Sequence, residues 1–227
     1  VVDTYEAGVK TSTQKIWKNF EQRKIVTYKE NYELNTLVSI ERSWREYDSA
    51  LQKVVTYTET FEGNIRTSTQ KMYKDQYKGR LATIIEIYEL DMASPTSIQK
   101  IYYDRVNTEL DGSRIVKVIE NWIQLGSTQY QQSIQYVYRK KDTVVINPET
   151  GATAEKIVNI IETYEGDFTA ASGYFLTQVQ KDYSILKDGR IVRVSSYYDP
   201  SLLTAPMSIQ IKSKRYNSDA NRMETVI

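Results

Sequence analysis

Two residue types that carry much of enzyme chemistry are missing from this sequence, which has no cysteine and no histidine. The lack of cysteine excludes a disulfide framework and thiolate chemistry. The lack of histidine removes the commonest general base and the commonest ligand of transition metals. No P-loop, dinucleotide fingerprint or Gly-x-Ser-x-Gly motif takes their place. We therefore expect a protein that is not an enzyme, with no catalytic residues, no cofactor and no metal site.

The sequence also lacks long apolar runs and an excess of charge of either sign. No apolar run approaches the roughly 18 residues that a transmembrane helix needs, so we expect no membrane-spanning segment. The 30 basic and 29 acidic residues leave a net charge of +1, so the overall charge does not imply a polyanionic partner and argues against a nucleic acid. The apolar content of 40 % is low and the count of 19 tyrosines is high, as is typical of strands whose two faces both meet water.

One short pattern recurs along the chain: an acid, any residue, then an aromatic. Its clearest copy is Ile-Ile-Glu-Thr-Tyr-Glu at residues 160–165. The acids of the successive copies are Asp3, Glu30, Glu59, Glu86, Glu120 and Glu162, with Ser196 as the one departure, and the aromatics are Tyr5, Tyr32, Phe61, Tyr88, Trp122, Tyr164 and Tyr198. A second segment alternates with the first and is clearest at residues 12–17, 68–73 and 97–102. Self-similarity at such a period indicates a repeat architecture.

Both repeated segments are predicted to be β-strands, because Ile, Val, Thr, Tyr, Phe and Trp dominate them and their side chains alternate with a period of two. Seven copies of each predict about fourteen strands. The expected segments, with a partial copy at each end, are 1–8, 11–21, 24–34, 37–47, 52–62, 66–77, 80–91, 97–108, 113–125, 128–141, 156–165, 174–184, 190–198, 207–217 and 222–227. The predicted fold is all-β: a long antiparallel meander of about seven β-hairpin repeats in one continuous domain, residues 1–227, forming an extended or curled sheet.

A sheet of this size closes into a barrel, splits into two packed layers or stays open, and the sequence leaves these three arrangements open. The strand at 80–90 is apolar on both faces, whereas the strand at 24–34 is polar on one. We therefore expect the middle of the sheet to be more covered than its N-terminal end. The longest insertion, residues 143–155, could carry a small hairpin of its own.

The two columns of the repeat are the candidate sites. A possible ligand face consists of Tyr32, Phe61, Tyr88, Trp122, Tyr164 and Tyr198; these rings either stack on a glycan or cover the sheet as a ladder. The acids stand on every second strand, about 10 Å apart, which is too far for two of them to share a metal ion. We expect them to pair with basic residues on the neighbouring strands, such as Lys15, Arg42, Lys71, Lys100 or Lys181. Replacing Glu59 or Glu86 by Gln should then cost at most about 1 kcal/mol.

The two ends of the chain match complementary halves of one repeat strand: residues 1–5 match 160–164, and residues 222–227 match 114–119. Unpaired strand edges are templates for strand addition. The candidate assembly ends are Val1, Val2, Tyr5, Thr225, Val226 and Ile227. Three explanations are open: the chain is a segment of a longer array, the ends meet within one molecule, or they meet between molecules in a head-to-tail filament. We favour the last.

Two hairpins, at residues 77–81 and 183–191, resemble the tyrosine–glycine–arginine turns of YD-type (RHS) repeats. The resemblance covers the turns only, and it implies an extracellular β-repeat shell. From the repeat itself we expect a non-enzymatic extracellular or cell-surface protein that acts as a scaffold or as an assembly subunit of a filament, stalk or surface layer. Its expected partners are further copies of itself or other surface proteins. The alternative is a binding module whose curved sheet holds a glycan or an apolar ligand on its aromatic face.

Overall fold

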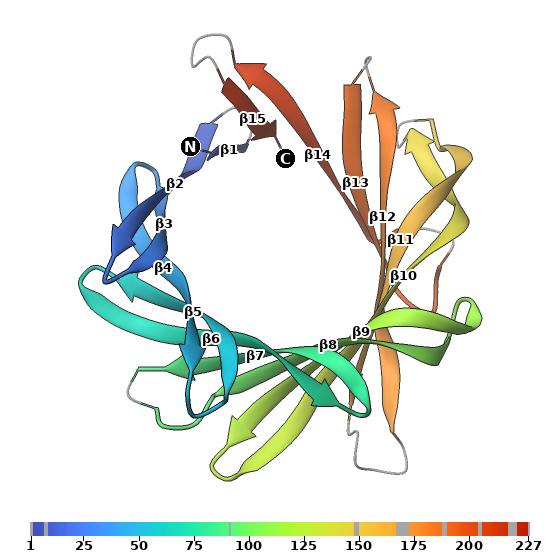
Figure 1. Ribbon diagram of the computed structural model, residues 1–227. Helices are drawn as coiled ribbons and strands as arrows, with labels where there is room; N and C mark the ends of the chain where they lie inside the picture. Colours follow the sequence, from blue (N-terminus) through green and yellow to red (C-terminus); the bar gives the residue numbers. More distant parts are fainter. Residues whose placement is uncertain are drawn as a thin grey trace. The chain divides into compact units, whose positions relative to one another are not determined.

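The computed structural model describes residues 2–6, 9–90, 92–147, 150–166, 173–187, 190–203, 206–217 and 222–226. Every regular element within these ranges is a β-strand (Figure 1). The strands are β1 (Val2–Glu6), β2 (Val9–Glu21), β3 (Lys24–Glu33), β4 (Thr36–Asp48), β5 (Lys53–Glu62), β6 (Ile65–Tyr77), β7 (Arg80–Glu89), β8 (Ser97–Thr108), β9 (Gly112–Leu125), β10 (Thr128–Asn147), β11 (Ala152–Gly166), β12 (Tyr174–Lys187), β13 (Arg190–Tyr198), β14 (Ser208–Asn217) and β15 (Arg222–Val226).

The predicted all-β antiparallel meander is confirmed, because strands that follow one another in the sequence lie side by side in the sheet. The described residues form fifteen strands rather than about fourteen, since the partial repeat at each end forms a short strand of its own. The insertion at 143–155 forms no separate hairpin. It lengthens the β10–β11 hairpin, in which Val144 lies opposite Ala154. No helix in the described ranges is long and apolar enough to cross a membrane.

Contacts divide the chain into two compact units. The first comprises Val1–Ile101, Asn121–Tyr130 and Arg215–Val226, and the second comprises Tyr102–Glu120, Gln131–Lys214 and Ile227. Each unit is described by itself below. The single continuous domain over residues 1–227 stays a prediction.

In the first unit, β1 to β8 pair successively and antiparallel, and short turns join the successive strands from β2 to β7. Two of these turns place consecutive non-glycine residues at positive φ: Gln22 and Arg23 at 48° and 65°, and Leu34 and Asn35 at 46° and 69°. Positive φ at both central residues is the mark of a type I′ turn, whose twist matches that of the flanking strands. Hairpin geometry therefore overrides local preference, most clearly at Leu34.

Bulges recur at one position of the repeat, and the sequence analysis did not predict them. The register shifts directly before the aromatic residue of the motif at Asn31/Tyr32, Thr60/Phe61 and Thr163/Tyr164. Two of the extra residues on the partner strands are threonines. The hydroxyl of Thr67 donates to the carbonyl of Thr60 at 3.3 Å, and the hydroxyl of Thr177 donates to the carbonyl of Thr163 at 3.1 Å. Because a bulge bends a strand and increases its twist, curvature is built into these three copies of the repeat.

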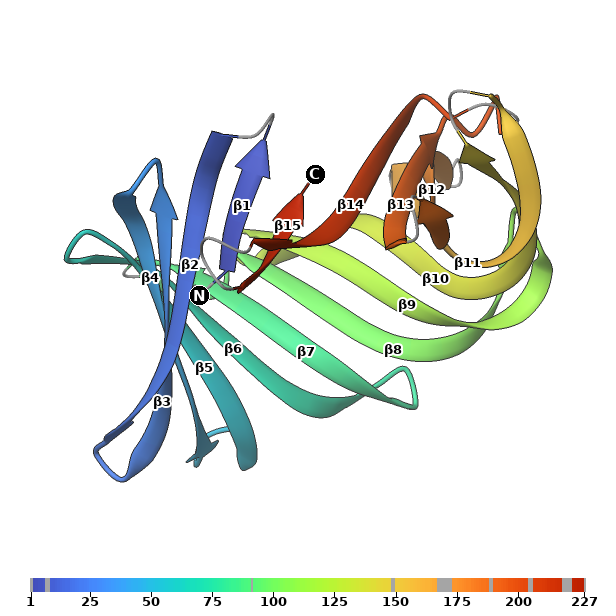
Figure 2. The same ribbon diagram turned by 90° about the horizontal axis from the view of Figure 1, so that it is seen from above.

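The second unit holds most of the fully buried side chains. Along β11, burial alternates strictly through Val158, Ile160, Glu162 and Tyr164. Figure 2 shows β10 and β11 curving along their length. By contrast, Val26 is the one buried residue of β3. The expectation that the middle of the chain is more covered than its N-terminal end is therefore correct.

Candidate functional site

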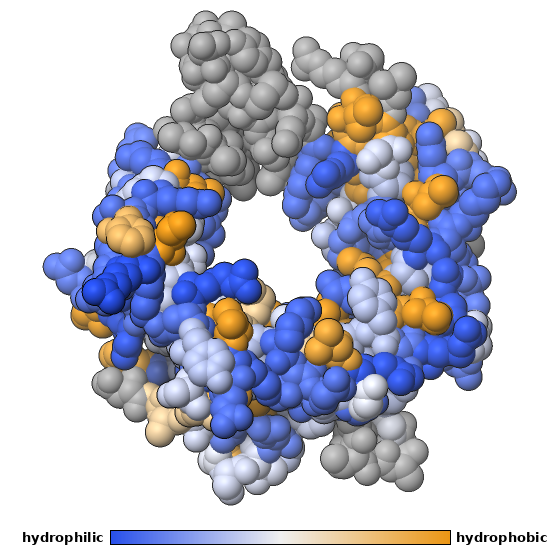
Figure 3. All heavy atoms as spheres, viewed as in Figure 1, coloured by the Kyte–Doolittle hydropathy of each residue, from blue (hydrophilic) through white to orange (hydrophobic). Residues whose placement is uncertain are grey.

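The strands of the first unit present two chemically different faces, because side chains alternate along each strand. The aromatic face carries the acid and aromatic columns, including Glu59 and Glu86. The threonine face is the opposite one and carries Thr27, Ser43 and Thr56. In the view of Figure 3 the surface over β3–β7 is mostly hydrophilic, with small separate hydrophobic patches.

Three acids of the column in the first unit lie opposite basic residues, as expected, whereas Asp3 lies opposite Thr13. The opposed pairs are Glu30 with Lys15, Glu59 with Arg42, and Glu86 with Lys71. Glu59 forms salt bridges with Arg42 at 2.6 Å and with Arg66 at 3.2 Å. It is 8 % exposed, so its charge is compensated close to the sheet surface.

Tyrosine hydroxyls are a second set of partners for the acids, which the sequence analysis missed. Glu86 accepts hydrogen bonds from Tyr73 and Tyr88, each at 2.8 Å. Glu30 accepts one from Tyr32 at 2.6 Å. Burial, and then the hydrogen bond to Glu86, raises the pKa of Tyr73 and Tyr88 well above the ordinary tyrosine value. The acid-x-tyrosine spacing could have indicated this, because residues i and i+2 share a face of a strand.

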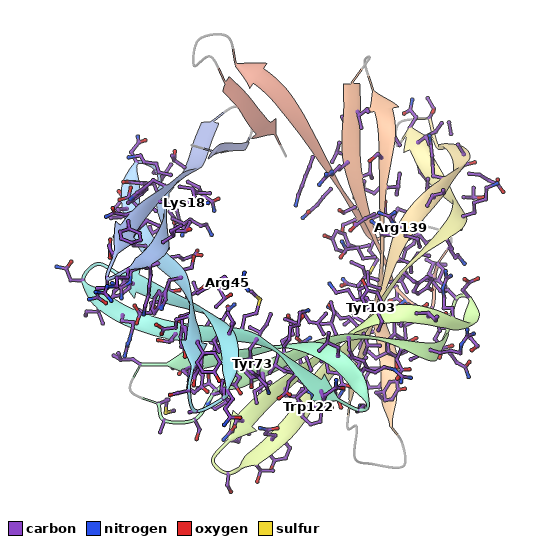
Figure 4. The ribbon with its side chains drawn as sticks, in the orientation of Figure 1. Lys18, Arg45, Tyr73, Tyr103, Trp122 and Arg139 are labelled. Atoms are coloured by element: carbon purple, nitrogen blue, oxygen red, sulfur yellow. The ribbon has the colours of Figure 1, made fainter. Side chains whose placement is uncertain are left out.

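The aromatic column is the predicted ligand face, and basic side chains occupy ring faces in five of its six members. The cation-to-centroid distances are 4.3 Å for Lys15 over Tyr32, 5.9 Å for Arg42 over Phe61, 5.0 Å for Lys71 over Tyr88, 4.5 Å for Lys100 over Trp122 (labelled in Figure 4) and 4.6 Å for Lys181 over Tyr198. The sixth ring, Tyr164, is 3 % exposed and Tyr198 is 4 % exposed. A sugar stacking on this column would have to displace cation–π contacts that stabilise the sheet.

The expected pairing with a basic residue is wrong for Glu162, the most deeply buried acid of the column, in the second unit. It lies opposite Tyr136 and Val179, Lys181 pairs with Asp142 instead, and the Glu162 carboxylate is satisfied by other donors. One oxygen accepts from the Tyr138 hydroxyl and the Leu110 backbone N–H, and the other accepts from the Tyr164 hydroxyl at 2.5 Å and the Glu109 backbone N–H at 3.2 Å. Residues 109 and 110 form the tip of the β8–β9 hairpin, which thus reaches β11. Burial and the Glu162 carboxylate raise the pKa of Tyr138 and Tyr164. This arrangement holds the sheet together and leaves no oxygen lone pair aimed at an open site.

No group of three or more acidic side chains that could hold a metal ion occurs in the described ranges.

The predicted assembly ends lie together in the first unit. There β15 runs parallel to β1, with Thr4 opposite Thr225 and Tyr5 opposite Val226. Val2 lies in β1 and pairs with Gln14 of β2. The other two predicted end residues, Val1 and Ile227, lie outside the described residues.

The threonine face of the first unit carries the feature that best fits a ligand site. A hollow of about 530 Å³ opens between β2 and β5, and it is lined by four basic residues and no carboxylate: Lys18, Arg23, Lys24 and Arg45. Lys24 is paired with Glu46. Within the described ranges the other three have no hydrogen-bond or ion-pair partner. Lys18 and Arg45 are labelled in Figure 4.

A second hollow of about 260 Å³ adjoins the first and shares Arg45 and Thr56 with it. Lys74 supplies its other cation, Val54 and Met72 supply apolar walls, and again no carboxylate lines it. The sequence carried a signal for this pair of hollows. In three successive copies of the second segment, the residue directly after the aromatic is basic: Trp17-Lys18, Trp44-Arg45 and Tyr73-Lys74.

Comparison with known proteins adds no further constraint beyond the likeness of two turns noted above. No protein-family model, no curated protein and no solved structure matches this chain.

Proposed function

We propose that this chain is a non-enzymatic binding protein that holds an anionic ligand on the threonine face of β2–β5. The single observation that carries the proposal is the hollow lined by Lys18, Arg23 and Arg45, whose side chains have no carboxylate partner among the described residues, beside Lys24, which is paired with Glu46. Its volume of about 530 Å³ falls within the roughly 300–1,000 Å³ of small-molecule sites. The proposed site therefore lies on the threonine face. The alternative predicted from the sequence had placed a glycan or an apolar ligand on the aromatic face instead.

The contrast between the two faces supports this choice. On the aromatic face each repeated cation lies opposite an acid or over a ring, as Arg42 does with Glu59 and Phe61. On the threonine face, Lys18 and Arg45 are left without such compensation among the described residues. Clefts lined by charges of one sign concentrate ligands of the other sign.

The experiment is calorimetric titration with a sulfated disaccharide and with its unsulfated counterpart. We expect the sulfated sugar to bind and the neutral one to bind at least tenfold more weakly. Lys18→Gln should weaken binding about tenfold, the value of one charge-assisted hydrogen bond. Lys15→Gln is the matched control. It removes the same charge from the same strand, on the opposite face, where Lys15 lies over Tyr32.

The proposal fails if both sugars bind equally or if Lys18→Gln and Lys15→Gln have the same effect. A far-ultraviolet circular dichroism spectrum of each variant checks that the sheet is intact. We place the protein outside the cell or on its surface, where acidic sugars are accessible, as part of the same proposal.

Assembly through the chain ends stays a prediction. The pairing of β1 with β15 within one chain determines what such assembly requires. Because Thr225 lies opposite Thr4 within the chain, head-to-tail addition requires that this pair open first. We expect Thr225→Pro to disrupt β15, since proline is excluded from strand interiors. Sedimentation velocity over a range of concentrations tests the prediction. A wild-type chain that remains monomeric at the highest concentration contradicts it.

A further inference from the structure

The basic residues of the threonine face belong to a ladder with one rung in every second hairpin of β2–β7. Each rung is a cation directly opposite a threonine: Lys18 with Thr27, Arg45 with Thr56, and Lys74 with Thr83. The rungs lie on the three successive hairpins β2–β3, β4–β5 and β6–β7. The two adjoining hollows contain all six of these residues.

The register fixes how the rungs are spaced. Thr27 lies opposite Ser43, so that Arg45, two residues further along β4, lies two strands across and two residues along from Lys18. The same step leads from Arg45 to Lys74, because Thr56 lies opposite Met72. With strands about 4.8 Å apart and about 3.4 Å per residue, each step is about 12 Å. The three cations therefore form a regular diagonal line across one face.

We infer that the ladder binds a linear acidic polysaccharide, one acidic group per rung. This inference rests on the proposed function and specifies its ligand as a polymer. A single small anion would use one hollow, whereas a chain with recurring sulfate or carboxylate groups would place successive groups at Lys18, Arg45 and Lys74. The threonine beside each cation supplies a hydroxyl that exchanges hydrogen bonds with the sugar. Apolar residues such as Ile25 and Val54 lie beside the rungs and suit the C–H surfaces of sugar rings.

A saccharide fits this face better than a single-stranded nucleic acid does. Nucleic-acid grooves of that kind combine cations with exposed rings on which bases stack. Here two aromatic residues, Trp44 and Tyr73, border the hollows, but their rings are already engaged. Trp44 stacks on Tyr57 and also carries Lys24 and Arg42 over its ring, and Tyr73 is 8 % exposed with its hydroxyl bonded to Glu86. The residue opposite each cation is a threonine, whose hydroxyl can hydrogen-bond to a sugar.

The ladder has a defined length within the first unit. In the second unit the corresponding positions of the repeat are Tyr103, Arg139 and Ser184. There Arg139 donates its Nε–H to Asn159 at 2.8 Å, and Ser184 lies opposite Arg193. Among the copies whose side chains are described, the cation–threonine pairing thus occurs at three rungs, which predicts a ligand footprint about 24 Å long, from two steps of about 12 Å.

The test is a length series of chondroitin sulfate oligosaccharides of two, four and six sugars, titrated against the intact chain. We expect the affinity to rise at least tenfold from the two-sugar to the six-sugar ligand and then to level off, because linked groups bind the later rungs intramolecularly. The dependence of affinity on salt should steepen in parallel. Lys74→Gln should remove the gain from length while leaving two-sugar binding within about twofold. Lys71→Gln, three residues earlier on β6 and on the opposite face, should change neither.

Three outcomes overturn the inference. The first is an affinity independent of length, and the second is an equal effect of Lys74→Gln and Lys71→Gln. The third is tighter binding of an oligothymidylate of the same charge, which would make the ligand a polynucleotide. If the two-sugar ligand binds and responds to Lys18→Gln but length brings no gain, the polymer inference alone fails. If no sulfated sugar binds at any length, the proposed function fails as well.

Discussion

Replacing Glu162 by glutamine tests whether the buried acids hold the sheet together. This carboxylate is 0 % exposed, and each of its oxygens accepts one tyrosine hydroxyl and one backbone N–H. Glutamine keeps the shape but turns one acceptor into a donor. A tyrosine hydroxyl can rotate to accept from the new amide, whereas the backbone N–H of Glu109 or Leu110 cannot.

The expected loss of stability follows from this difference between a tyrosine hydroxyl, which can rotate, and a backbone N–H, which cannot. One buried backbone donor left without an acceptor costs about 1–3 kcal/mol, and the remaining bonds fall from charge-assisted to neutral strength. We expect Glu162→Gln to lower the free energy of unfolding by about 3 kcal/mol. For a chain of this length, that corresponds to about 6–12 °C in melting temperature.

Glu86→Gln is the matched control, because it lies at the same position of the repeat. Its partners are the hydroxyls of Tyr73 and Tyr88, both of which can rotate, and the side chain is half-buried. The expected cost is at most about 1 kcal/mol. Urea unfolding followed by circular dichroism measures both variants. Equal destabilisation, or a larger effect at Glu86, would refute the reasoning.

Three further predictions follow from single positions. Leu34→Gly should raise the free energy of unfolding by about 1 kcal/mol in the same urea assay, since φ is 46° at this residue and the left-handed conformation costs a residue with a Cβ about 1–2 kcal/mol that glycine avoids. Thr67→Val should cost about 1 kcal/mol by removing its hydrogen bond to Thr60, with faster amide exchange in β5 and β6 as the local readout. The Tyr57 hydroxyl and nearby backbone N–H groups lower the pKa of Asp48 below 3.8; the stability that this supplies is present above the ordinary pKa and is lost as the pH falls below it. Asp48→Asn should therefore flatten the loss of stability between about pH 5 and pH 3, and an unchanged acid profile would contradict that assignment.

Much of the fold could be predicted from the sequence because its signal is local and repeated. Period-two alternation in stretches such as 24–34 and 80–90 indicated strands, and glycines and short polar pairs marked the turns. The pairing of the acid column with Lys15, Arg42 and Lys71 was also predictable, because consecutive strands in a meander fix their own register. The hydrogen bonds from tyrosine to these acids could also have been predicted from the acid-x-tyrosine spacing, but the sequence analysis missed them.

The candidate site was less predictable. The aromatic columns stand out in the sequence because they are the most regular feature of the repeat, yet most of their ring faces are occupied by cations. Lys18 and Arg45 each follow a tryptophan directly, and this recurring dipeptide marks the position in the sequence. It does not show whether the cation has a carboxylate partner. The structure decides this, because only it shows which carboxylates come within reach.

By itself, then, the sequence determined the strands, their order and the two chemical faces, since these depend on side-chain alternation and on neighbours a few residues away. Tertiary structure alone decided the features that join distant residues. The bulges at Thr67 and Thr177 curve the sheet, the hairpin tip at 109–110 closes on Glu162, 53 and 52 residues away, and β15 pairs with β1. The physical reason is that curvature accumulates over many strands, so contacts between distant segments depend on the sum of small local bends that no single stretch of sequence specifies.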